Sequence, residues 1–351
     1  MMGELDLNEV GEWLSGTGPE SDIVMSTRIR LARNVVGYPF LTRIEDRRRS
    51  ELERWLRERI TGAKLGYDVS YQNLNAASPL ERQCLVERHL ISRDHAAGKG
   101  DRGVAVGPKG MVSVMVNEED HLRIQVLRSG FQPDASWRQI LEFDKKLEGQ
   151  MDFAFSPEFG YLTACPTNCG TGLRVSVMLH LPALVMTKQI EKVFHAVSKV
   201  GLAVRGFYGE GTQAQGDFYQ ISNQITLGRS EEEVLRTVAD YVPQIIKFER
   251  NWREKLIAEN RVGLEDRVWR AFGMLERARL ITSDETMDYL SAVRMGVNLG
   301  LIDAIPISTV NELFILTQPA HLQKLSGSEL DTPERDENRA DYVRRRLASL
   351  N

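Results

Sequence analysis

The sequence predicts an α+β protein, with a central antiparallel sheet flanked by helices and an all-helical part after it. Three observations support this fold class. Short alternating apolar runs occur between residues 102 and 227, helical periodicities lie before and between them, and strand patterns stop after about Trp252. We therefore expect a boundary near residue 250, with a sheet domain over 1–250 and a helical domain over 251–351.

The expected elements of the first domain follow the chain in order. Residues 46–60 place apolar side chains on one face of a charged helix, and residues 102–128 form an antiparallel meander with a polar turn at 117–121. The other expected elements are a helix over 134–151, a strand over 173–181, a helix over 188–200 that ends at Gly201, and a strand over 221–227.

Helix-start signals define the second part of the chain. A Ser or Thr followed three residues later by Glu is a capping box, in which each side chain bonds the backbone N–H of the other residue. Such boxes occur at Ser230 with Glu233, at Thr282 with Glu285 and at Thr309 with Glu312. They predict three helices, and a charged helix is expected from about Pro333 to the end.

Composition excludes several partner classes. Lys and Arg number 45 against 49 Asp and Glu, so the formal charge of −4 provides no overall field for nucleic acid or an anionic membrane. No apolar stretch is long enough to span a bilayer, and the N-terminus has no secretory signal pattern. Three cysteines make no disulfide framework, so we expect a cytoplasmic protein.

Familiar nucleotide and metal motifs do not occur in the sequence. It has no P-loop, no Gly-rich dinucleotide fingerprint, no protein-kinase motif set and no His-Glu-x-x-His. Arginine nevertheless makes up 34 of the 45 basic residues, which suits phosphate recognition, although a bias in the genome explains it equally well. In Ser26-Thr-Arg28-Ile-Arg30, an extended chain aims both guanidinium groups at one side, where they could grip a polyphosphate or form a solvated strand face.

Carboxylates and a cysteine form two further candidate constellations. Glu118, Glu119 and Asp120 are consecutive, and such close like charges require solvent, a cation or a cationic substrate; an exposed hairpin tip is the alternative. Glu210 lies between glycines that keep its loop adaptable. Cys165 precedes an expected buried strand and is either a small packed side chain or a thiolate that orients a bound cation.

Together these segments resemble one family. Ser26-Thr-Arg28-Ile-Arg30, Asn117-Glu-Glu-Asp-His-Leu-Arg123, Cys165-Pro-Thr-Asn-x-Gly-Thr and Arg205-Gly-x-x-Gly-Glu210 occur in the order found in the ATP:guanidino phosphotransferases, or phosphagen kinases. The similarity covers roughly residues 20–250. It implies a phosphagen-kinase-like catalytic domain that uses ATP and Mg²⁺.

The resemblance implies a nucleotide site. Its core is a clamp of five arginines on the ATP phosphates, with His89 against the adenine. Glu118 is implied to reach Mg²⁺ through water, with no direct protein ligand to the metal. The residues implied to bind ATP are Ser26, Thr27, Arg28, Ile29, Arg30, His89, Arg123, Arg174, Val175, Ser176, Val177, Met178, Arg205, Gly206, Phe207, Tyr208 and Gly209.

The resemblance also implies an acceptor site. Glu119 and Glu210 match the two carboxylates that hold the guanidinium, and Cys165 matches the reactive cysteine beside it. A guanidinium has a pKa of about 12.5 or more and is a poor nucleophile. One carboxylate must therefore take its proton during attack, while arginines and Mg²⁺ align and neutralise the transferring group.

Departures from the family pattern narrow the substrate. Members that act on free creatine or arginine carry a helical N-terminal domain, for which there is no room before Ser26, and a histidine where this chain has Met178. The extension after residue 250 is instead similar to that of the protein arginine kinases. We therefore expect ATP-dependent phosphorylation of arginine side chains in proteins. A small-molecule guanidino kinase and a non-catalytic phosphoarginine-binding protein are the alternatives.

The tail supports the same choice. Arg335-Asp336-Glu-Asn-Arg339-Ala340 resembles the motif that forms an allosteric phosphoarginine pocket in protein arginine kinases, and otherwise fits a salt-bridged surface helix. The resemblance also implies several partners and roles: protein substrates with exposed arginine, an activator protein, a Clp-type chaperone or protease that degrades the marked proteins, inactivation of a heat-shock repressor, and a homodimer.

Overall fold

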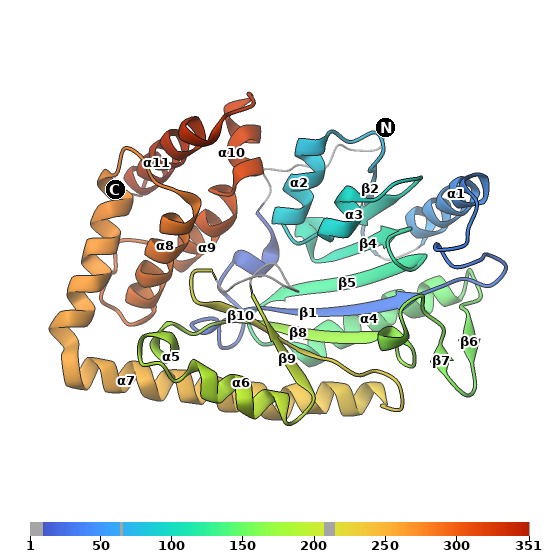
Figure 1. The fold of residues 1–351 in the computed structure, drawn as a ribbon, viewed down its shortest axis with the longest axis horizontal. Helices are drawn as coiled ribbons and strands as arrows, with labels where there is room; N and C mark the ends of the chain where they lie inside the picture. Colours follow the sequence, from blue (N-terminus) through green and yellow to red (C-terminus); the bar gives the residue numbers. More distant parts are fainter. Residues whose placement is uncertain (1–9, 64–65, 207–214, 351) are drawn as a thin grey trace.

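An eight-stranded antiparallel sheet forms the centre of the molecule (Figure 1). The computed structural model describes residues 10–63, 66–206 and 215–350. The strand order is β2-β3-β4-β5-β1-β8-β10-β9. The strands are β1 (Val24–Arg33), β2 (Ser70–Asn73), β3 (Gly103–Val106), β4 (Val112–Val116), β5 (Leu122–Ser129), β8 (Leu173–His180), β9 (Leu202–Arg205) and β10 (Phe218–Asn223).

Helices cover one face of this sheet. Every second side chain of the central strands, such as Ile29 and Val175, is fully buried against them. The packing helices are α1 (Asp46–Gly62), α4 (Pro133–Glu148), α6 (Ile190–Ser198) and the first half of α7 (Glu231–Arg277), which runs beneath the sheet in Figure 1. This single apolar layer holds the strands rigid and leaves their alternate side chains on the opposite face.

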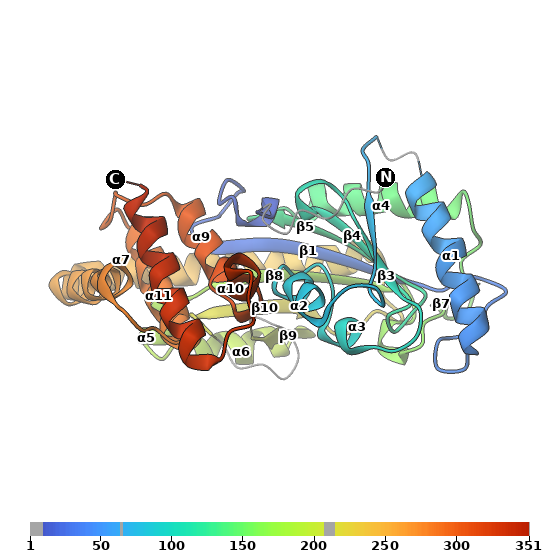
Figure 2. The same cartoon turned by 90° about the horizontal axis from the view of Figure 1, so that it is seen from above.

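The opposite face is only partly covered. Two short helices, α2 (Pro79–Glu87) and α3 (Arg93–Ala97), pack over β3 and β4 through a small separate core that includes Leu85 and Met115. They lie beside β2 and β4 in Figure 1 and beside β3 in Figure 2. Polar side chains of the central strands therefore remain accessible beside them.

The C-terminal part is helical, as predicted. Helix α7 is broken at Asn260, where the backbone leaves helical geometry, and its second half turns up along the remaining helices (Figure 1). Those helices are α8 (Ser283–Asn298), α9 (Ile307–Leu316), α10 (Pro319–Ser326) and α11 (Thr332–Ala348). Their core also takes in Met178 and Phe218 from the end of the sheet, so the two parts share apolar contacts.

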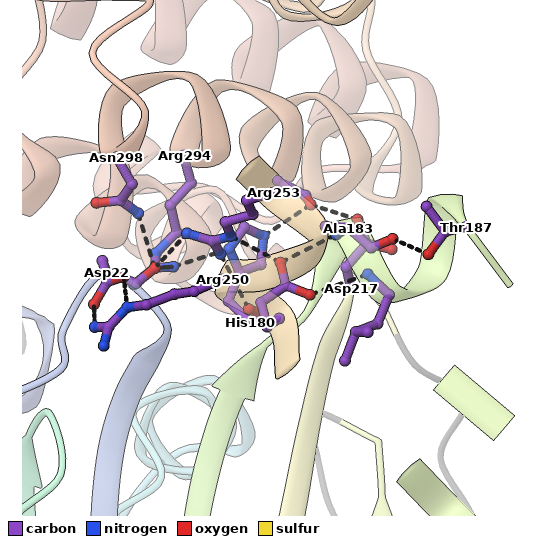
Figure 3. A network of polar contacts seen from close by, with 12 residues as sticks. Asp22, His180, Ala183, Thr187, Asp217, Arg250, Arg253, Arg294 and Asn298 are labelled. Carbon is purple, nitrogen blue, oxygen red and sulfur yellow. Dashed lines mark hydrogen bonds and ion pairs between the residues drawn. The ribbon is translucent and has the colours of Figure 1, made fainter. Parts of the chain in front are cut away.

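A buried polar network joins the sheet to the helical part (Figure 3). Arg294 of α8 is fully buried and donates to the backbone oxygens of Ser21 and Asp22 at 2.7 and 3.1 Å, and it lies 2.9 Å from Nδ1 of His180. The other ring nitrogen of His180 lies 2.9 Å from the hydroxyl of Ser291. Burial and the nearby Arg294 and Arg253 lower the pKa of His180 well below its usual value, so this ring is neutral.

Several helix predictions are confirmed and one is wrong. Capping boxes are formed at Ser230 for α7 and at Thr282 for α8. The box predicted at Thr309 does not form, because α9 begins at Ile307 after Pro306, and Thr309 already lies inside its first turn. Helix α7 also crosses the boundary predicted near residue 250 without interruption at that point.

Among the described residues, no helix combines the length and apolar character that a membrane crossing needs.

Smaller elements complete the fold. They are the helix α5 (Pro182–Met186), the hairpin strands β6 (Phe155–Ser156) and β7 (Gly160–Tyr161), and the 3-10 turns η1 (Glu12–Leu14), η2 (Pro108–Gly110) and η3 (Pro166–Asn168).

Candidate active site

A cleft of about 610 Å³ lies on the open face of the sheet. The structure brings to it all five arginines of the predicted clamp, together with the predicted acidic turn and Cys165. It adds a sixth cation, Arg93 at the start of α3, which the sequence reading missed. The clamp arginines are Arg28, Arg30, Arg123, Arg174 and Arg205.

Strand pairing explains why the arginines meet. Strand β1 lies between β5 and β8, and Arg30 is directly opposite Arg174 on β8. Because residues two apart point to the same face, Arg28 and Arg30 both enter the cleft. The intervening residues of the predicted ATP set, Thr27, Ile29, Val175 and Val177, are fully buried on the other face of the sheet.

The clustered arginines of the cleft repel one another. Burial and the charges of Arg123, Arg174 and Arg205 lower the pKa of Arg28 to about 9. Burial and the same kind of repulsion also lower the pKa of Arg30. Like charges raise each other's energy when no anion lies between them, so this cleft is built to receive a group with several negative charges.

The predicted acidic turn is formed at the junction of β4 and β5. Asn117 has a φ of +60°, and its N–H donates to the carbonyl of His121, which closes the turn. Glu118 is paired with Arg123 at 2.7 Å and accepts from Ser92 at 2.5 Å. Although burial opposes its charge, Arg123 and these hydrogen bonds hold the pKa of Glu118 at about 2.

Glu119 differs from its neighbour. Its side chain lines the cleft and is exposed, but the partial burial of the carboxylate, together with the charges of Asp120 and Glu118, raises its pKa. Its Oε2 accepts a long hydrogen bond of 3.4 Å from Asn168. A carboxylate with a raised pKa and little pairing is suited to hold a cation and to accept a proton.

The cysteine loop is fixed to the acidic turn from behind. Asp120 is buried and its Oδ1 accepts from the backbone N–H of Ala164 at 2.7 Å and from Asn34 at 2.6 Å. Cys165 follows directly, and its Sγ lies 3.0 Å from the hydroxyl of Thr167. Asp120 thereby sets the distance between Glu119 and Cys165, a role that sequence reasoning did not assign.

The predicted adenine contact, His89, also lines the cleft. His89 has a φ of +59°, packs edge-on against Trp13, and its carbonyl accepts from Gln125 at 2.6 Å. Burial and the charges of Arg28 and Arg93 lower the pKa of His89 to about 3, so the ring is neutral and can stack or bond with a base. Ser26, Ser176 and Met178 line the adjoining recess.

Gln220 of β10 is a second residue that the sequence reading missed. It hydrogen-bonds to Arg28 and lines the cleft. His180, the histidine two residues after Met178, points instead into the network of Figure 3. Four residues of the predicted site, Phe207, Tyr208, Gly209 and Glu210, lie outside the described residues, whereas Gly206 is buried just before them.

The predicted phosphoarginine motif lies on α11. Arg339 is buried, and its guanidinium donates to the backbone oxygens of Thr317 and Ile281 at 2.9 and 2.8 Å and to Asp336 at 2.5 Å. Ala340 is buried beside it. Arg335 is only half-buried and donates to Leu330 and Thr332. Of the two arginines of this motif, Arg335 is the one that lies near the surface.

Comparisons with known proteins agree with this geometry. The family described as ATP:guanido phosphotransferase, C-terminal catalytic domain, matches residues 51–252. The chain belongs to the ATP:guanido phosphotransferase family. A second family, described as Protein-arginine kinase McsB C-terminal domain, matches residues 261–351.

Relatives of similar length extend the comparison. A protein-arginine kinase of Moorella thermoacetica is 47% identical over 348 residues, which cover 98% of this chain and 99% of the relative. One from Desulforamulus reducens is 47% identical over 346 residues, which cover 98% of this chain and 97% of the relative.

Two solved structures of kinases share the fold. The duplicated taurocyamine kinase from Schistosoma mansoni, with bound transition state analog components, gives a TM-score of 0.59 at 29% identity, covering 72% of this chain and 36% of that chain. Lombricine kinase gives a TM-score of 0.56 at 27% identity, with 71% of each chain covered. The phosphagen-kinase-like fold predicted from the sequence is therefore confirmed.

Proposed function

We propose that this protein transfers the γ-phosphoryl group of ATP to the guanidinium group of arginine side chains in proteins. The observation that carries the proposal is one cleft that is lined by the five clamp arginines together with Glu119 and Cys165. The relatives named protein-arginine kinase, similar over nearly the whole chain, support the choice of acceptor.

The arginine clamp supplies alignment and charge neutralisation. The polyphosphate of ATP relieves the repulsion among Arg28, Arg30 and their neighbours, so binding energy is available at the point where the reacting group must be fixed. In the transition state, negative charge spreads over the transferring oxygens, and the fixed guanidinium groups stabilise it without reorganising.

Glu119 is assigned to the acceptor. Its carboxylate holds the substrate guanidinium by paired hydrogen bonds and receives the proton that the attacking nitrogen loses. The new N–P bond forms as the bond from the γ-phosphorus to the bridging oxygen breaks, and ADP leaves with that electron pair. Cys165 lies on the adjoining loop, and Glu210 is proposed as the second carboxylate by family resemblance.

Mg²⁺ is proposed as the metal cofactor. Among the described residues, no cluster of three or more His, Cys, Asp or Glu side chains is placed to hold a metal ion. By family resemblance, Glu118 would reach the ion only through water. Its Oε1 already accepts from Arg123 and Ser92, and its Oε2 accepts from the backbone N–H of Glu119. Such an ion supplies additional positive charge to the transferring phosphoryl group.

One experiment separates this proposal from its rivals. The protein is incubated with γ-labelled ATP and either an unfolded protein or free arginine, and acid-labile phosphate is measured. Label on the protein supports the proposal, and Glu119→Gln should abolish most of it. Label on free arginine alone would establish a small-molecule kinase, and no label with intact phosphoarginine binding would establish a non-catalytic binding protein.

Allosteric control by phosphoarginine is proposed at Arg335. The helix that carries it is tied to the start of α8, because Ile281 N–H donates to the carbonyl of Asp336 and Arg339 returns a bond to Ile281. Arg335→Gln should reduce activation by phosphoarginine severalfold and leave the Kd for ATP unchanged. Arg345→Gln, an exposed arginine on the same helix, is the matched control.

The cellular roles stay proposals from family resemblance. We propose that the modified proteins are degraded by a Clp-type protease, that a heat-shock repressor is one target, that an activator protein participates and that the chain forms a homodimer in the cytoplasm. Phosphoarginine mapping on proteins that accumulate when the protease is inactivated tests the first of these roles.

A further inference from the structure

Four exposed apolar side chains gather beside the cysteine loop. Phe155 and Phe159 lie on the β6–β7 hairpin and are 58% and 47% exposed, and Ile225 and Leu227 follow β10 and are 56% and 48% exposed. They are four of the ten large apolar side chains that stand exposed in the described part of the chain. We refer to these four side chains as the apolar rim.

Both halves of the rim are attached to one short segment. The hairpin pairs with Gly170, because Tyr161 N–H donates to the Gly170 carbonyl at 2.7 Å. From the other side, the hydroxyl of Thr226 donates to the carbonyls of Thr167 and Cys169 at 2.9 and 2.6 Å. The segment from Thr167 to Gly170 therefore lies between the two apolar loops.

The packing around Gly170 shows how closely the two loops approach. A Cβ atom added at Gly170 would lie 2.6 Å from the carbonyl oxygen of Thr226, and one added at Gly160 would lie 2.5 Å from the carbonyl oxygen of Gly170. Only backbone fits at these points. The backbone next to Phe159 and the backbone at Leu227 therefore both contact Gly170.

The rim continues directly into the acceptor end of the cleft. Cys165, Thr167 and Asn168 of the same loop line the cleft, and Asn168 bonds Glu119. A polypeptide whose arginine reaches Glu119 must leave the cleft past this loop or on the side away from it. On the loop side its neighbouring residues meet the apolar rim.

The charge around the rim suits a cationic segment. Glu158 at the hairpin and Glu232 at the start of α7 are exposed. Helix α7 begins at Glu231, four residues after Leu227, so its acidic first turn directly follows this half of the rim. Arg229 is the exposed cation of this stretch, so carboxylates predominate around the four apolar side chains.

We propose that the apolar rim binds aliphatic or aromatic side chains that flank the target arginine in an extended, unfolded polypeptide. The inference rests on the proposed function and adds a substrate preference to it. Folded proteins bury such side chains, whereas unfolded segments expose them next to their charged residues. Contact with the rim removes apolar surface from water on both partners and so favours unfolded over folded substrates.

The test compares two peptides and two pairs of substitutions. Both peptides carry one arginine, flanked in one peptide by Leu and Phe and in the other by Gly and Ser. The kcat/KM ratio between them is measured for the wild type, for Phe155→Ser with Phe159→Ser, and for Ile225→Ser with Leu227→Ser. The control is Val262→Ser with Trp269→Ser, two exposed apolar residues on α7 far along the chain from the rim.

A wild-type ratio of about tenfold or more, which falls toward one in both rim variants and is kept in the control, is the expected result. A ratio near one in the wild type, or a wild-type ratio in the rim variants, would overturn the proposal. Peptide binding, measured by fluorescence anisotropy, tests the rim preference separately from the proposed kinase function. Absence of phosphate transfer to either peptide refutes the proposed function, while the ratio of the two Kd values still decides whether the rim selects apolar flanks.

Discussion

Glu119 and Glu118 are adjacent carboxylates with opposite electrostatic settings. Arg123 and Ser92 keep Glu118 ionised and use its hydrogen-bonding capacity. Glu119 lines the cleft and accepts only a long hydrogen bond of 3.4 Å from the Asn168 side chain. The turn that carries both is fixed by Asp120, which is bonded to Asn34 and to the cysteine loop. In the proposed mechanism, this turn uses Glu118 to support the nucleotide clamp and Glu119 to contact the acceptor.

Glu119→Gln should reduce kcat by about a hundredfold to ten-thousandfold, because the amide cannot take the proton from the attacking nitrogen. The Kd for ATP should stay near its original value. Isothermal titration with ATP and a label-transfer assay measure the two quantities. An equal loss of ATP affinity would place Glu119 in the nucleotide site instead.

The acid limb of the activity profile should report the same residue. Glu119 must be ionised to act, and burial with two neighbouring carboxylates raises its pKa above 4.5. As pH falls, kcat/KM should therefore decline at a higher pH than for an ordinary glutamate. Asp120→Asn removes one of those charges and should move the decline to lower pH. Circular dichroism at each pH controls for unfolding.

Arg30→Gln should stabilise the ligand-free protein by about 1 kcal/mol, because it removes one charge from a crowded and buried cluster. The same change should weaken ATP binding by at least about tenfold. Chemical denaturation with and without ATP measures both effects. A ligand-free protein that is less stable than the wild type would show that Arg30 is needed for packing.

Sequence patterns identified many of the predicted site residues, but they did not show which of these residues lie next to each other in the fold. Arg28 and Arg30 could be paired from their spacing alone, since a strand alternates. The proximity of Arg30 to Arg174 depends on the antiparallel register of β1 with β8, which no local pattern encodes. Gln220 and Asn34 carry no motif at all, and only the folded sheet shows that they contact Arg28 and Asp120.

At the scale of elements, one prediction error is informative. The strand expected over 221–227 ends at Asn223, although the alternation of Ile225 and Leu227 continues the pattern. Pairing stops because the chain leaves β8 and turns to bond the cysteine loop through Thr226. The apolar alternation of Ile225 and Leu227 therefore belongs to an exposed loop beside the candidate active site and not to the expected strand.

Helix α2 was missed although its signal is present. Ser78 and Glu81 form a capping box, and Pro79 occupies the first turn. The same rule that identified α7 and α8 would have identified this helix. The helix bears on the predicted site, because α2 ends at Glu87 and leads directly to His89, the predicted adenine contact.

Glu87 connects α2 to the helical part. Its buried carboxylate accepts from the backbone N–H groups of Ala320 and His321 at 2.9 and 3.0 Å and lies 2.7 Å from Nδ1 of His321. It thereby caps the N-terminus of α10, where a negative charge is favourable.

Glu87→Gln should lower the free energy of unfolding by about 2 kcal/mol, because the amide turns a donor toward groups that also donate. In this variant, the backbone amides of α10 should exchange hydrogen faster than in the wild type, whereas exchange in α4 should change less. Urea unfolding and hydrogen exchange measure these effects. Glu329→Gln, an exposed glutamate near the end of α10, is the control and should leave both unchanged.

For the whole molecule, the junction in Figure 3 decides how the two parts stay together. Glu249 of α7 accepts from the N–H groups of Ala183 and Leu184 and pairs with Arg253, all in buried surroundings. Arg294 adds bonds from α8 to the N-terminal segment and to His180. The domain boundary predicted near residue 250 lies within α7, the helix that carries Glu249 and Arg253 of this network.

Two arginines of this network provide a matched comparison. Arg294 is fully buried, whereas the side chain of Arg250 is 41% exposed and pairs with Glu20 and Asp22 at the surface. Arg294→Met should destabilise the protein by about 3 kcal/mol or more, because the Ser21 carbonyl and the buried side chains of His180 and Asn311 lose the hydrogen bonds of Arg294. Arg250→Met should cost no more than about 1 kcal/mol, since solvent screens that pair.

Urea unfolding of the two variants, followed separately by far-UV circular dichroism and tryptophan fluorescence, measures both the stability and its cooperativity. If the buried junction couples the parts, Arg294→Met should separate the two transitions, while Arg250→Met keeps them coincident. Equal losses in the two variants would show that the shared apolar core around Phe218, and not the polar network, holds the sheet and the helical part together.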